Sequence, residues 1–470
     1  MEVINSIWGY LFNNIIARPG IFIGVIVAVG YILLKKKWYE VLAGFIIAAV
    51  GYMILQIGAG NLKSTVDPIL AGINEKFAIE AVVIDPNFGL TAATAALESI
   101  GESFSFAMIT LLIAFIWNIL LVSIRKVSKI RTLFTTGHIM VKQAAVATWI
   151  IFFLLPDLRN FYGILLTALL CGTYWSVFSN LTVEATNDLT DNAGFAIGHQ
   201  QMLGVWFADK FSGKIGKKED GVGKFELSGA LKLFDDYVVS TTLVMLLFFS
   251  VLILIIGEPI LRGVDKNFAK DISFLTYIFE TGARFSVSLV VLKTGVRMFV
   301  NELVNSFDGI SSTFLKGSVP AVDCAATYGF GDANAITLGF IFGAVGQLVA
   351  IALLIIFKSP LMIIPGFVPL FYDNATIGLY ANNKGGFKAL IVMCIGSGLI
   401  QVLGSAVAIK MFNMAEFGGY VGNFDWASVW PILGFFIKNL YVIGAILGIV
   451  LMLAIPQVQY LKNKDKYFSV

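Results

Sequence analysis

The sequence predicts an all-α polytopic membrane protein, and three observations lead to that fold class. Of the 470 residues, 58% are hydrophobic and 13% are charged, whereas soluble domains have roughly 45–50% and about 25%. The mean hydropathy is +0.84. Long apolar runs recur along the chain, where a membrane β-barrel would show short alternating strands. Together these observations exclude a soluble enzyme, a secreted disulfide scaffold and a disordered chain.

Apolar segments of about 20 residues, the length that crosses a bilayer, follow one another along the chain. Nine spans are predicted, at 20–34, 41–60, 104–124, 161–179, 238–256, 273–292, 335–357, 389–409 and 432–455. Two shorter stretches, 144–155 and 359–372, are bounded by proline or charge and are predicted as re-entrant or broken helices. Counting both gives eleven crossings and counting neither gives nine, so the two termini are expected on opposite sides.

Basic residues predict the orientation of these spans. Lysines 35–37 follow the first span, and Lys462, Lys464 and Lys466 end the chain. Because cytoplasmic loops carry an excess of lysine and arginine, we expect an external N-terminus and a cytoplasmic C-terminus. No cleavable signal peptide is expected, since the first residues lack a basic region and a small-residue cleavage site.

Charge and cysteine content exclude several other kinds of site. The net charge of +3 is too small to indicate nucleic-acid binding. Cys171, Cys324 and Cys394 lie in apolar surroundings without a CxxC pair, so we expect packing residues rather than a disulfide or a metal site.

An internal similarity at an offset of about 180 residues predicts two repeats. IRTLFTTGHIMVKQAA at 130–145 aligns with ISSTFLKGSVPAVDCA at 310–325, and Asp191-Asn192-Ala193 recurs as Asp373-Asn374-Ala375. Repeated halves are typical of solute transporters. The expected organisation is repeat one at about 20–205, a polar loop at about 206–237, repeat two at about 238–410 and a final helix at 432–455. The loop is expected to be a solvated connector, with a partner-docking surface as the alternative.

A few ionisable residues stand near the predicted spans, where charge costs about 2.5–3.5 kcal/mol on insertion scales. The two histidines of the chain, His138 and His199, each follow a glycine. Asp323 is expected either to cap a broken helix or to accept a bond from a substrate hydroxyl. Lys142 shares a helix face with His138 and either reaches toward the interface or meets an anionic ligand. This set of donors and acceptors suits a polyhydroxylated ligand.

Two other function classes remain open at this point. The same carboxylate and histidines could carry protons in an ion-coupled secondary transporter of a polyhydroxylated or acidic solute, without phosphorylation. They could also hold a metal in an intramembrane enzyme, but no HExxH or similarly tight spacing is present, so neither metal nor cofactor is expected. No GxSxG, Walker loop or CxxC occurs. A phosphoryl donor would therefore have to lie on another chain, and whether this chain counts as an enzyme stays open.

Five segments carry a resemblance to a known family: TTGHIM, GFAIGHQQ, AVDCAA, TGVRMFVNEL and PGFVPLFYDNATIG. There, and over nearly the whole chain, the sequence resembles the ascorbate-specific enzyme IIC permeases of the bacterial phosphotransferase system. The resemblance implies a single permease unit, residues 1–470, in the bacterial inner membrane. It implies import of L-ascorbate or a close analogue, phosphorylated by a separate phospho-enzyme IIB that an enzyme IIA charges.

The same resemblance implies an architecture. It implies about eleven transmembrane helices in inverted repeats, with re-entrant or broken helices. It also implies a core domain, a V-shaped dimerisation domain, a homodimer and an elevator-type movement of the core.

The resemblance also implies the ligand residues and the proton acceptor. TGHIM and the residues after it give His138, Ile139, Met140, Val141 and Lys142, GHQ gives His199 and Gln200, and DCAA gives Asp323. A family Thr-Tyr pair falls on Asn87 and Phe88, so the family's phenol is missing, and Lys142 stands where the family has glutamine. Ascorbate is an anion, so a lysine could strengthen its binding through a charge-assisted hydrogen bond. Asp323 or His199 is expected to accept the proton of the hydroxyl that attacks the phosphocysteine.

Overall fold

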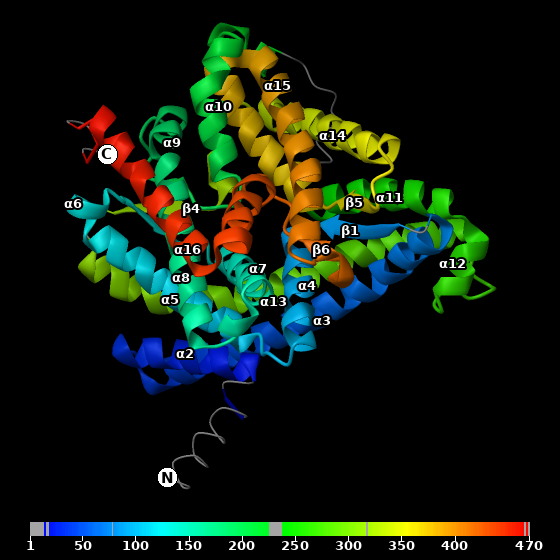
Figure 1. Cartoon of the computed structure of the whole chain (residues 1–470), viewed down its shortest axis with the longest axis horizontal. Coiled ribbons are helices and arrows are strands. Elements are labelled where there is room, and N and C mark those ends of the chain that lie inside the picture. Colours follow the sequence, from blue (N-terminus) through cyan, green and yellow to red (C-terminus); the bar gives the residue numbers. More distant parts are fainter. Residues whose placement is uncertain are drawn as a thin grey trace.

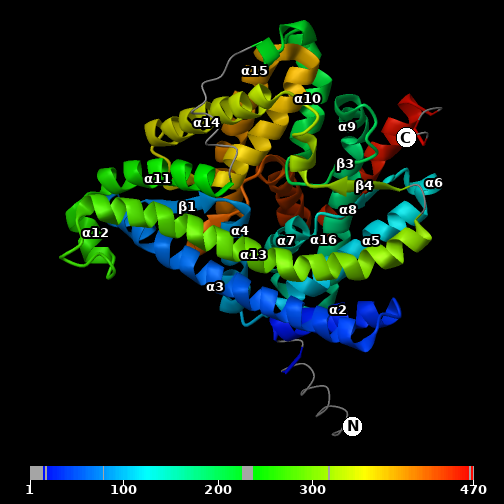
Figure 2. The same cartoon turned by 180° about the vertical axis from the view of Figure 1, so that it is seen from behind.

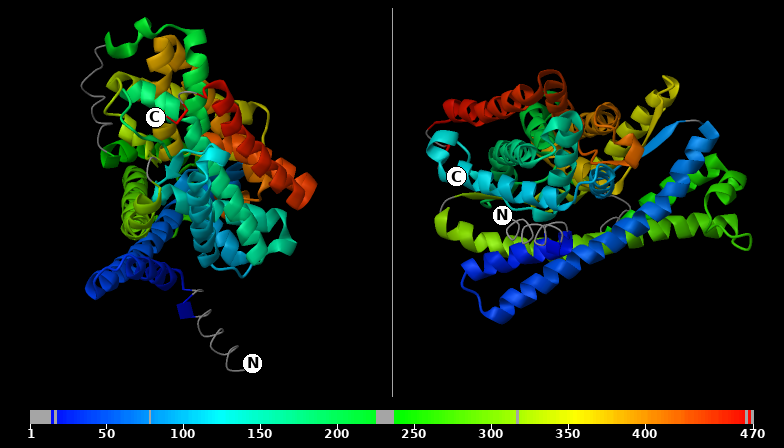
Figure 3. Two further views of the ribbon diagram at one scale, coloured as in Figure 1. Left: turned by 90° about the vertical axis from the view of Figure 1, so that its left-hand side faces the viewer. Right: turned by 60° about the horizontal axis from the view of Figure 1, so that its bottom comes forward.

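The computed structural model describes residues 14–15, 18–77, 79–224, 237–315, 318–464 and 467–468. Most of them are helical, and the helices form two parts that lie against each other (Figure 3). Eight helices in the described ranges are long and apolar enough to cross a membrane, or nine if the bent pair α11–α12 is counted as one span. The polytopic helical class is therefore confirmed, whereas the described residues do not reach the predicted count of eleven.

One part is a layer of long helices. Its members are α2 (Pro19–Leu33), α3 (Trp38–Phe77), α11 (Tyr237–Ile256), α12 (Glu258–Val264) and α13 (Phe274–Phe314). Glycines let α3 and α13 pack closely, because a Cβ at Gly58 would lie 2.4 Å from the Leu292 nitrogen. Small residues at helix crossings are the usual means of close packing in membranes. Figure 3 shows α3 and α13 side by side along one face of the molecule.

The other part holds the remaining helices around the buried aromatic core. They are α4 (Pro86–Ser99), α5 (Ser105–Ser123), α6 (Arg125–Ser128), α7 (Gly137–Leu154), α8 (Phe161–Leu181), α9 (Val183–Thr190), α10 (Met202–Ile215), α14 (Ala333–Ile356), α15 (Asn374–Met411) and α16 (Phe424–Lys462). Trp175, Trp426 and Trp430 are among its largest fully buried side chains. The backbone departs from helical geometry at Gly386 within α15 and at Tyr441 within α16.

Two small parallel sheets join segments that are far apart in sequence. One has the order β5 (Leu361–Pro365), β1 (Glu80–Ile84), β6 (Gly419–Tyr420), and the other β2 (Thr132–Phe134), β4 (Val319–Val322), β3 (Ala196–Ile197). Val82 pairs with Ile363 in the first, and Leu133 pairs with Pro320 in the second. The arrangement is reciprocal. Each central strand lies between two strands from the other half of the chain.

One predicted span and both shorter apolar stretches differ from the observed elements. The stretch 20–34 corresponds to α2, whose 15 residues are shorter than a span. The stretch 144–155 belongs to α7, which is long enough to cross because it starts at Gly137. The re-entrant or broken helix expected at 359–372 is corrected in its first part, since residues 361–365 form β5 and helical turns begin only at residue 367. These residues are apolar, and a run of that length does not distinguish a strand from a short helix.

Some of the predicted segment boundaries differ from the bounds of the observed helices. The loop expected at 206–237 begins within α10, which extends to Ile215, and residues 225–236 lie outside the described residues. The final helix is longer than predicted, at Phe424–Lys462. The internal similarity at an offset of 180 residues aligns a strand with a helix. Phe134 is the last residue of β2, whereas Phe314, 180 residues later, is the last residue of α13. Like elements match at a larger offset: a helix of 40 residues precedes β1 and one of 41 residues precedes β4.

Candidate functional site

A cavity of about 330 Å³ lies where the carboxyl ends of both sheets meet α13. In parallel sheets, loops at the carboxyl ends commonly build the ligand site. In Figure 2, α13 runs across the molecule below β1 and β4. The cavity is lined by Asn87, His138, Ile139, Lys142, His199, Val296, Arg297, Val300, Asn301, Asp323, Ala325, Val368 and Tyr372.

His138 and Asp323 face each other across the second sheet. His138 follows β2 and Asp323 follows β4, and these two strands are hydrogen-bonded neighbours. The His138 Nε2 atom lies 3.3 Å from Asp323 Oδ2, and both side chains are more than one third exposed to the cavity. Asp323 Oδ1 accepts a hydrogen bond from the Ala325 N–H at 3.0 Å. The carboxylate therefore caps a helical turn, as one reading of the sequence predicted, and also faces the cavity.

His199 lies just after β3, and one of its ring nitrogens is hydrogen-bonded to Gln201. Its Nδ1 lies 2.5 Å from Gln201 Oε1, and the same oxygen accepts a bond from the Gln200 N–H. Because that atom is an acceptor, the neutral imidazole carries its proton on Nδ1, and Nε2 is left as a proton acceptor. The preceding Gly198 is needed at this point, since a Cβ there would lie 2.6 Å from the Ala321 carbonyl oxygen.

Asn87 reaches the cavity from the first sheet. The buried carboxylate of Asp85 accepts bonds from the Asn87 N–H and side-chain amide, both at 2.8 Å. Its other oxygen accepts a bond from the Val368 N–H at 3.0 Å. Asp85 thus ties the loops after β1 and β5 together and orients the Asn87 amide.

Two cations and one carboxylate, Asp323, line this cavity of mixed polar and apolar residues. Lys142 follows His138 by one helical turn in α7 and is buried, so the alternative that it reaches the membrane interface does not describe its position. Arg297 enters from α13, in the opposite layer. Two positive charges around one cavity favour an anionic ligand.

Of the ten residues that the sequence predicts as ligands, six line the cavity: Asn87, His138, Ile139, Lys142, His199 and Asp323. Four do not. Phe88 stacks on Phe285 instead, Met140 and Val141 are buried within α7, and Gln200 is buried behind His199. The Gln200 amide has no hydrogen-bond partner among the described residues. A buried amide in that state is costly and can be satisfied by a ligand or a water.

Sequence reasoning missed the residues that α13 and the segment after β5 supply. Arg297 and Asn301 lie in the TGVRMFVNEL segment, and Tyr372 lies in PGFVPLFYDNATIG. Both segments stood out in the sequence, but nothing in them indicated which side chains face a cavity. Tyr372 brings a phenol to the site, which the Asn87-Phe88 pair lacks.

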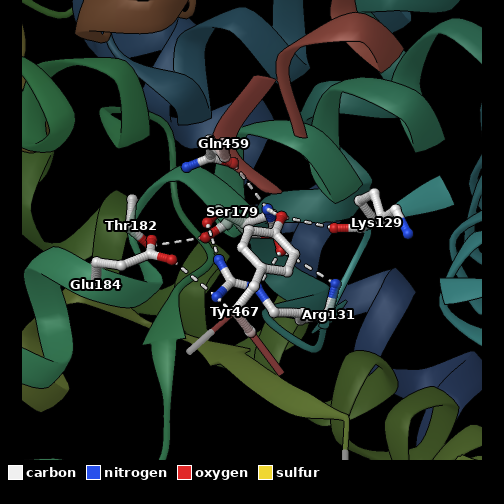
Figure 4. Close-up of polar contacts among 8 residues, drawn as sticks. Lys129, Arg131, Ser179, Thr182, Glu184, Gln459 and Tyr467 are labelled. Atoms are coloured by element: carbon white, nitrogen blue, oxygen red, sulfur yellow. Dashed lines mark hydrogen bonds and ion pairs between the residues drawn. The ribbon is translucent and has the colours of Figure 1, made fainter. Parts of the chain in front are cut away.

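Tyr467, near the C-terminal end, contacts Arg131 just before β2, the strand that leads to His138 (Figure 4). Arg131 is 3% exposed, donates to the Tyr467 carbonyl at 3.0 Å and lies 3.8 Å from the centre of the Tyr467 ring. Tyr467 donates its hydroxyl proton to the Lys129 carbonyl at 2.7 Å and accepts a bond from Asn180 at 2.8 Å. Burial raises the pKa of Tyr467, so its hydroxyl remains protonated and keeps donating. Glu184 completes the group through an ion pair of 2.8 Å with Arg131.

The same histidines and aspartate have the spacing of possible metal ligands. One atom from each of His138, His199 and Asp323 lies within 4.8 Å of the others. Three such donors can bind a transition metal. The geometry alone therefore does not separate a metal site from a site for hydroxyl groups.

Comparisons with known proteins identify a family whose model matches this chain and a protein of similar sequence. The family model for the PTS system sugar-specific permease component, EIIC-GAT, matches residues 14–427. An ascorbate-specific PTS system EIIC component from Mycoplasma pneumoniae is 32% identical over 443 residues. That similarity covers 86% of this chain and 66% of the relative, so the chain spans just under two thirds of the relative's length.

Proposed function

The chain belongs to the family of sugar-specific permease components of the phosphotransferase system (PTS), and from this we propose that it takes up L-ascorbate or a close analogue while a separate phospho-enzyme IIB phosphorylates it. An enzyme IIA would charge that IIB. The chain is a multi-pass membrane protein. We place it in the bacterial inner membrane, with the N-terminus outside and the C-terminus in the cytoplasm.

The observation that carries this proposal is the mixture of groups in one cavity. Lys142 and Arg297 supply positive charge, while His138, His199 and Asp323 supply bonds for hydroxyl groups. An apolar solute would not need these groups, and a neutral polyol would not need two cations. An anionic compound with several hydroxyl groups, such as ascorbate, matches both features.

In the proposed reaction, a ligand hydroxyl attacks the phosphorus of the IIB phosphocysteine. The new O–P bond forms as the S–P bond breaks, and the hydroxyl proton passes to His199 Nε2, the acceptor that its Gln201 contact leaves available. Asp323 accepts a bond from a second hydroxyl and keeps His138 oriented. Of the two acceptors that the sequence left open, Asp323 and His199, our proposal takes His199, and the Gln201 contact supports this choice.

The architecture suggests how the cavity changes sides. The two sheets exchange strands reciprocally between the halves, which is the pattern expected of paired repeats with inverted topology. The cavity has one wall on the long-helix layer and the others on the second part. We propose that the long-helix layer forms the V-shaped homodimer interface and that the other part moves along it in an elevator-type step. The completed span count would then be eleven.

Equilibrium binding to the purified protein in detergent tests the substrate. L-Ascorbate should bind saturably and galactitol should not. Asp323→Asn should weaken ascorbate binding about ten- to hundredfold, since hydrogen bonds to a charged group contribute about 1.5–3 kcal/mol. Asp332→Asn is the matched control, because Asp332 caps α14 in the same way without lining the cavity. Equal losses in the two variants would remove Asp323 from the proposed site.

Two competing functions have their own measurements. An ion-coupled transporter, which the His138–Asp323 pair could serve, would accumulate ascorbate in energised vesicles that lack the soluble phosphotransferase proteins, whereas the proposed permease would not. A metalloenzyme would carry stoichiometric zinc or iron after purification. Elemental analysis of the protein decides that alternative.

A further inference from the structure

A second cavity, of about 460 Å³, shares no lining residue with the first and lies between α10, the α8–α9 junction and α16. Figure 3 shows α16 at the outer edge of the molecule. Seven residues of α16 and its C-terminal cap line this cavity at helical spacing: Leu451, Ala454, Ile455, Val458, Gln459, Lys462 and Asn463. One helix face, about three turns long, therefore forms one wall of the cavity.

Polarity along that face changes in one direction. Leu451, Ala454 and Ile455 are apolar, Gln459 is neutral and polar, and Lys462 is the last residue of the helix. The half-exposed side chains of Leu451 and Val458 show that the apolar end opens outward. In a membrane protein such a surface meets lipid tails, whereas lysines at helix ends meet headgroups.

The polar end of the cavity carries two lysines, of which Lys462 is without an ion pair in the described part of the chain. Lys462 has no hydrogen bond or ion pair with any residue in the described part of the chain. Lys210, on α10, is half exposed and pairs with Asp209, whose other oxygen lies 3.4 Å from Lys384. The cavity's acidic residue, Glu184, is already paired with Arg131 in the network of Figure 4. Trp206 adds an amphipathic ring of the kind that gathers at membrane interfaces.

We propose that this cavity is a binding site for one anionic phospholipid. Its acyl chain lies along Leu451, Ala454 and Ile455, and its phosphate lies between Lys210 and Lys462. The charge complementarity favours an anionic headgroup, and the graded helix face favours a lipid over a soluble anion. This site is separate from the substrate cavity and does not depend on the proposed transport function.

Native mass spectrometry of the purified protein, titrated with phosphatidylglycerol or phosphatidylcholine, tests the site. We expect one phosphatidylglycerol to bind at least about tenfold more tightly than phosphatidylcholine, because each lysine near a headgroup favours the anionic lipid. The double variant Lys210→Gln/Lys462→Gln should lose that preference. Ala454→Phe, which fills the apolar end, should weaken the binding of both lipids.

The control is Lys410→Gln/Lys438→Gln, which removes two exposed lysines outside the cavity, on α15 and α16. It should keep the wild-type preference. Equal affinity of the wild type for the two lipids would overturn the proposal. So would an equal loss of preference in the two double variants, because diffuse surface charge would then explain the binding. Unchanged elution on size exclusion confirms that each variant is folded.

Discussion

At the scale of single residues, the cavity combines groups from both parts of the molecule. His138, His199 and Asp323 come from the loops after one sheet, whereas Arg297 comes from α13 in the long-helix layer. Arginine offers a fixed set of five donors that suits a delocalised anion. Arg297, in the long-helix layer, would therefore contact the ligand's negative charge, whereas the other part of the molecule would bind the ligand's hydroxyl groups.

Arg297→Gln should therefore weaken ascorbate binding about tenfold, the equivalent of about 1.4 kcal/mol, while Arg297→Lys should recover part of the loss. Isothermal titration of the variants in detergent measures the effect. Arg284→Gln is the matched control on the same helix, because Arg284 is exposed and pairs with Glu280. If Arg297→Gln binds ascorbate as tightly as that control does, the guanidinium does not contact the ligand.

At the scale of elements, short strands place the site and the chain end stabilises one of them. β2 has only three residues, and Arg131 just before it is the centre of a hydrogen-bonded network. Its side chain joins Asn180 at the end of α8 to the Tyr467 carbonyl. The segment after α16 therefore helps to hold the strand that positions His138.

Tyr467→Phe should lower the free energy of unfolding by about 1–3 kcal/mol, because it removes the hydroxyl that joins Lys129 to Asn180. The aromatic ring over Arg131 is retained, so Tyr467→Ala should cost more. Thermal unfolding in detergent measures both variants. Tyr460→Phe is the control, since the Tyr460 hydroxyl makes no hydrogen bond within the described ranges. If the unfolding midpoint of Tyr467→Phe is no lower than that of Tyr460→Phe, the Tyr467 hydroxyl does not stabilise the fold.

At the scale of the whole molecule, the cavity lies at the boundary between two parts with different packing. α3 and α13 approach through glycines along one layer, whereas the other part is organised around two reciprocal sheets. Val300 on α13 and Ala325 after β4 line the same cavity from opposite sides of that boundary. A sliding movement would separate them, but would leave contacts within the layer unchanged.

Joining Val300→Cys to Ala325→Cys with a short bifunctional thiol reagent should thus abolish uptake. The native cysteines are buried and should not react. Tyr31→Cys joined to Glu302→Cys is the control, because these side chains meet within the long-helix layer at 2.5 Å. Uptake in reconstituted vesicles with the soluble phosphotransferase proteins measures both pairs. Full uptake by the first linked pair would rule out relative movement at this boundary.

The sequence by itself determined the membrane class and part of the site. Composition and long apolar runs are properties of the chain alone, and they predicted the helical, polytopic architecture. The two histidines and Asp323 stood out because charged and polar groups are rare among such runs. The structure brings these three together within 4.8 Å.

Only the tertiary structure showed where the strands lie, how they pair in the two sheets and which residues of α13 and the segment after β5 line the cavity. β1 pairs with a strand about 280 residues away, and no local periodicity reports such a partner. The same reason explains why the sequence did not indicate that Arg297 and Tyr372 line the cavity and that Phe88 does not. Which face of a helix lines a cavity depends on the other elements that pack against that helix. The neighbouring residues in the sequence do not indicate this packing.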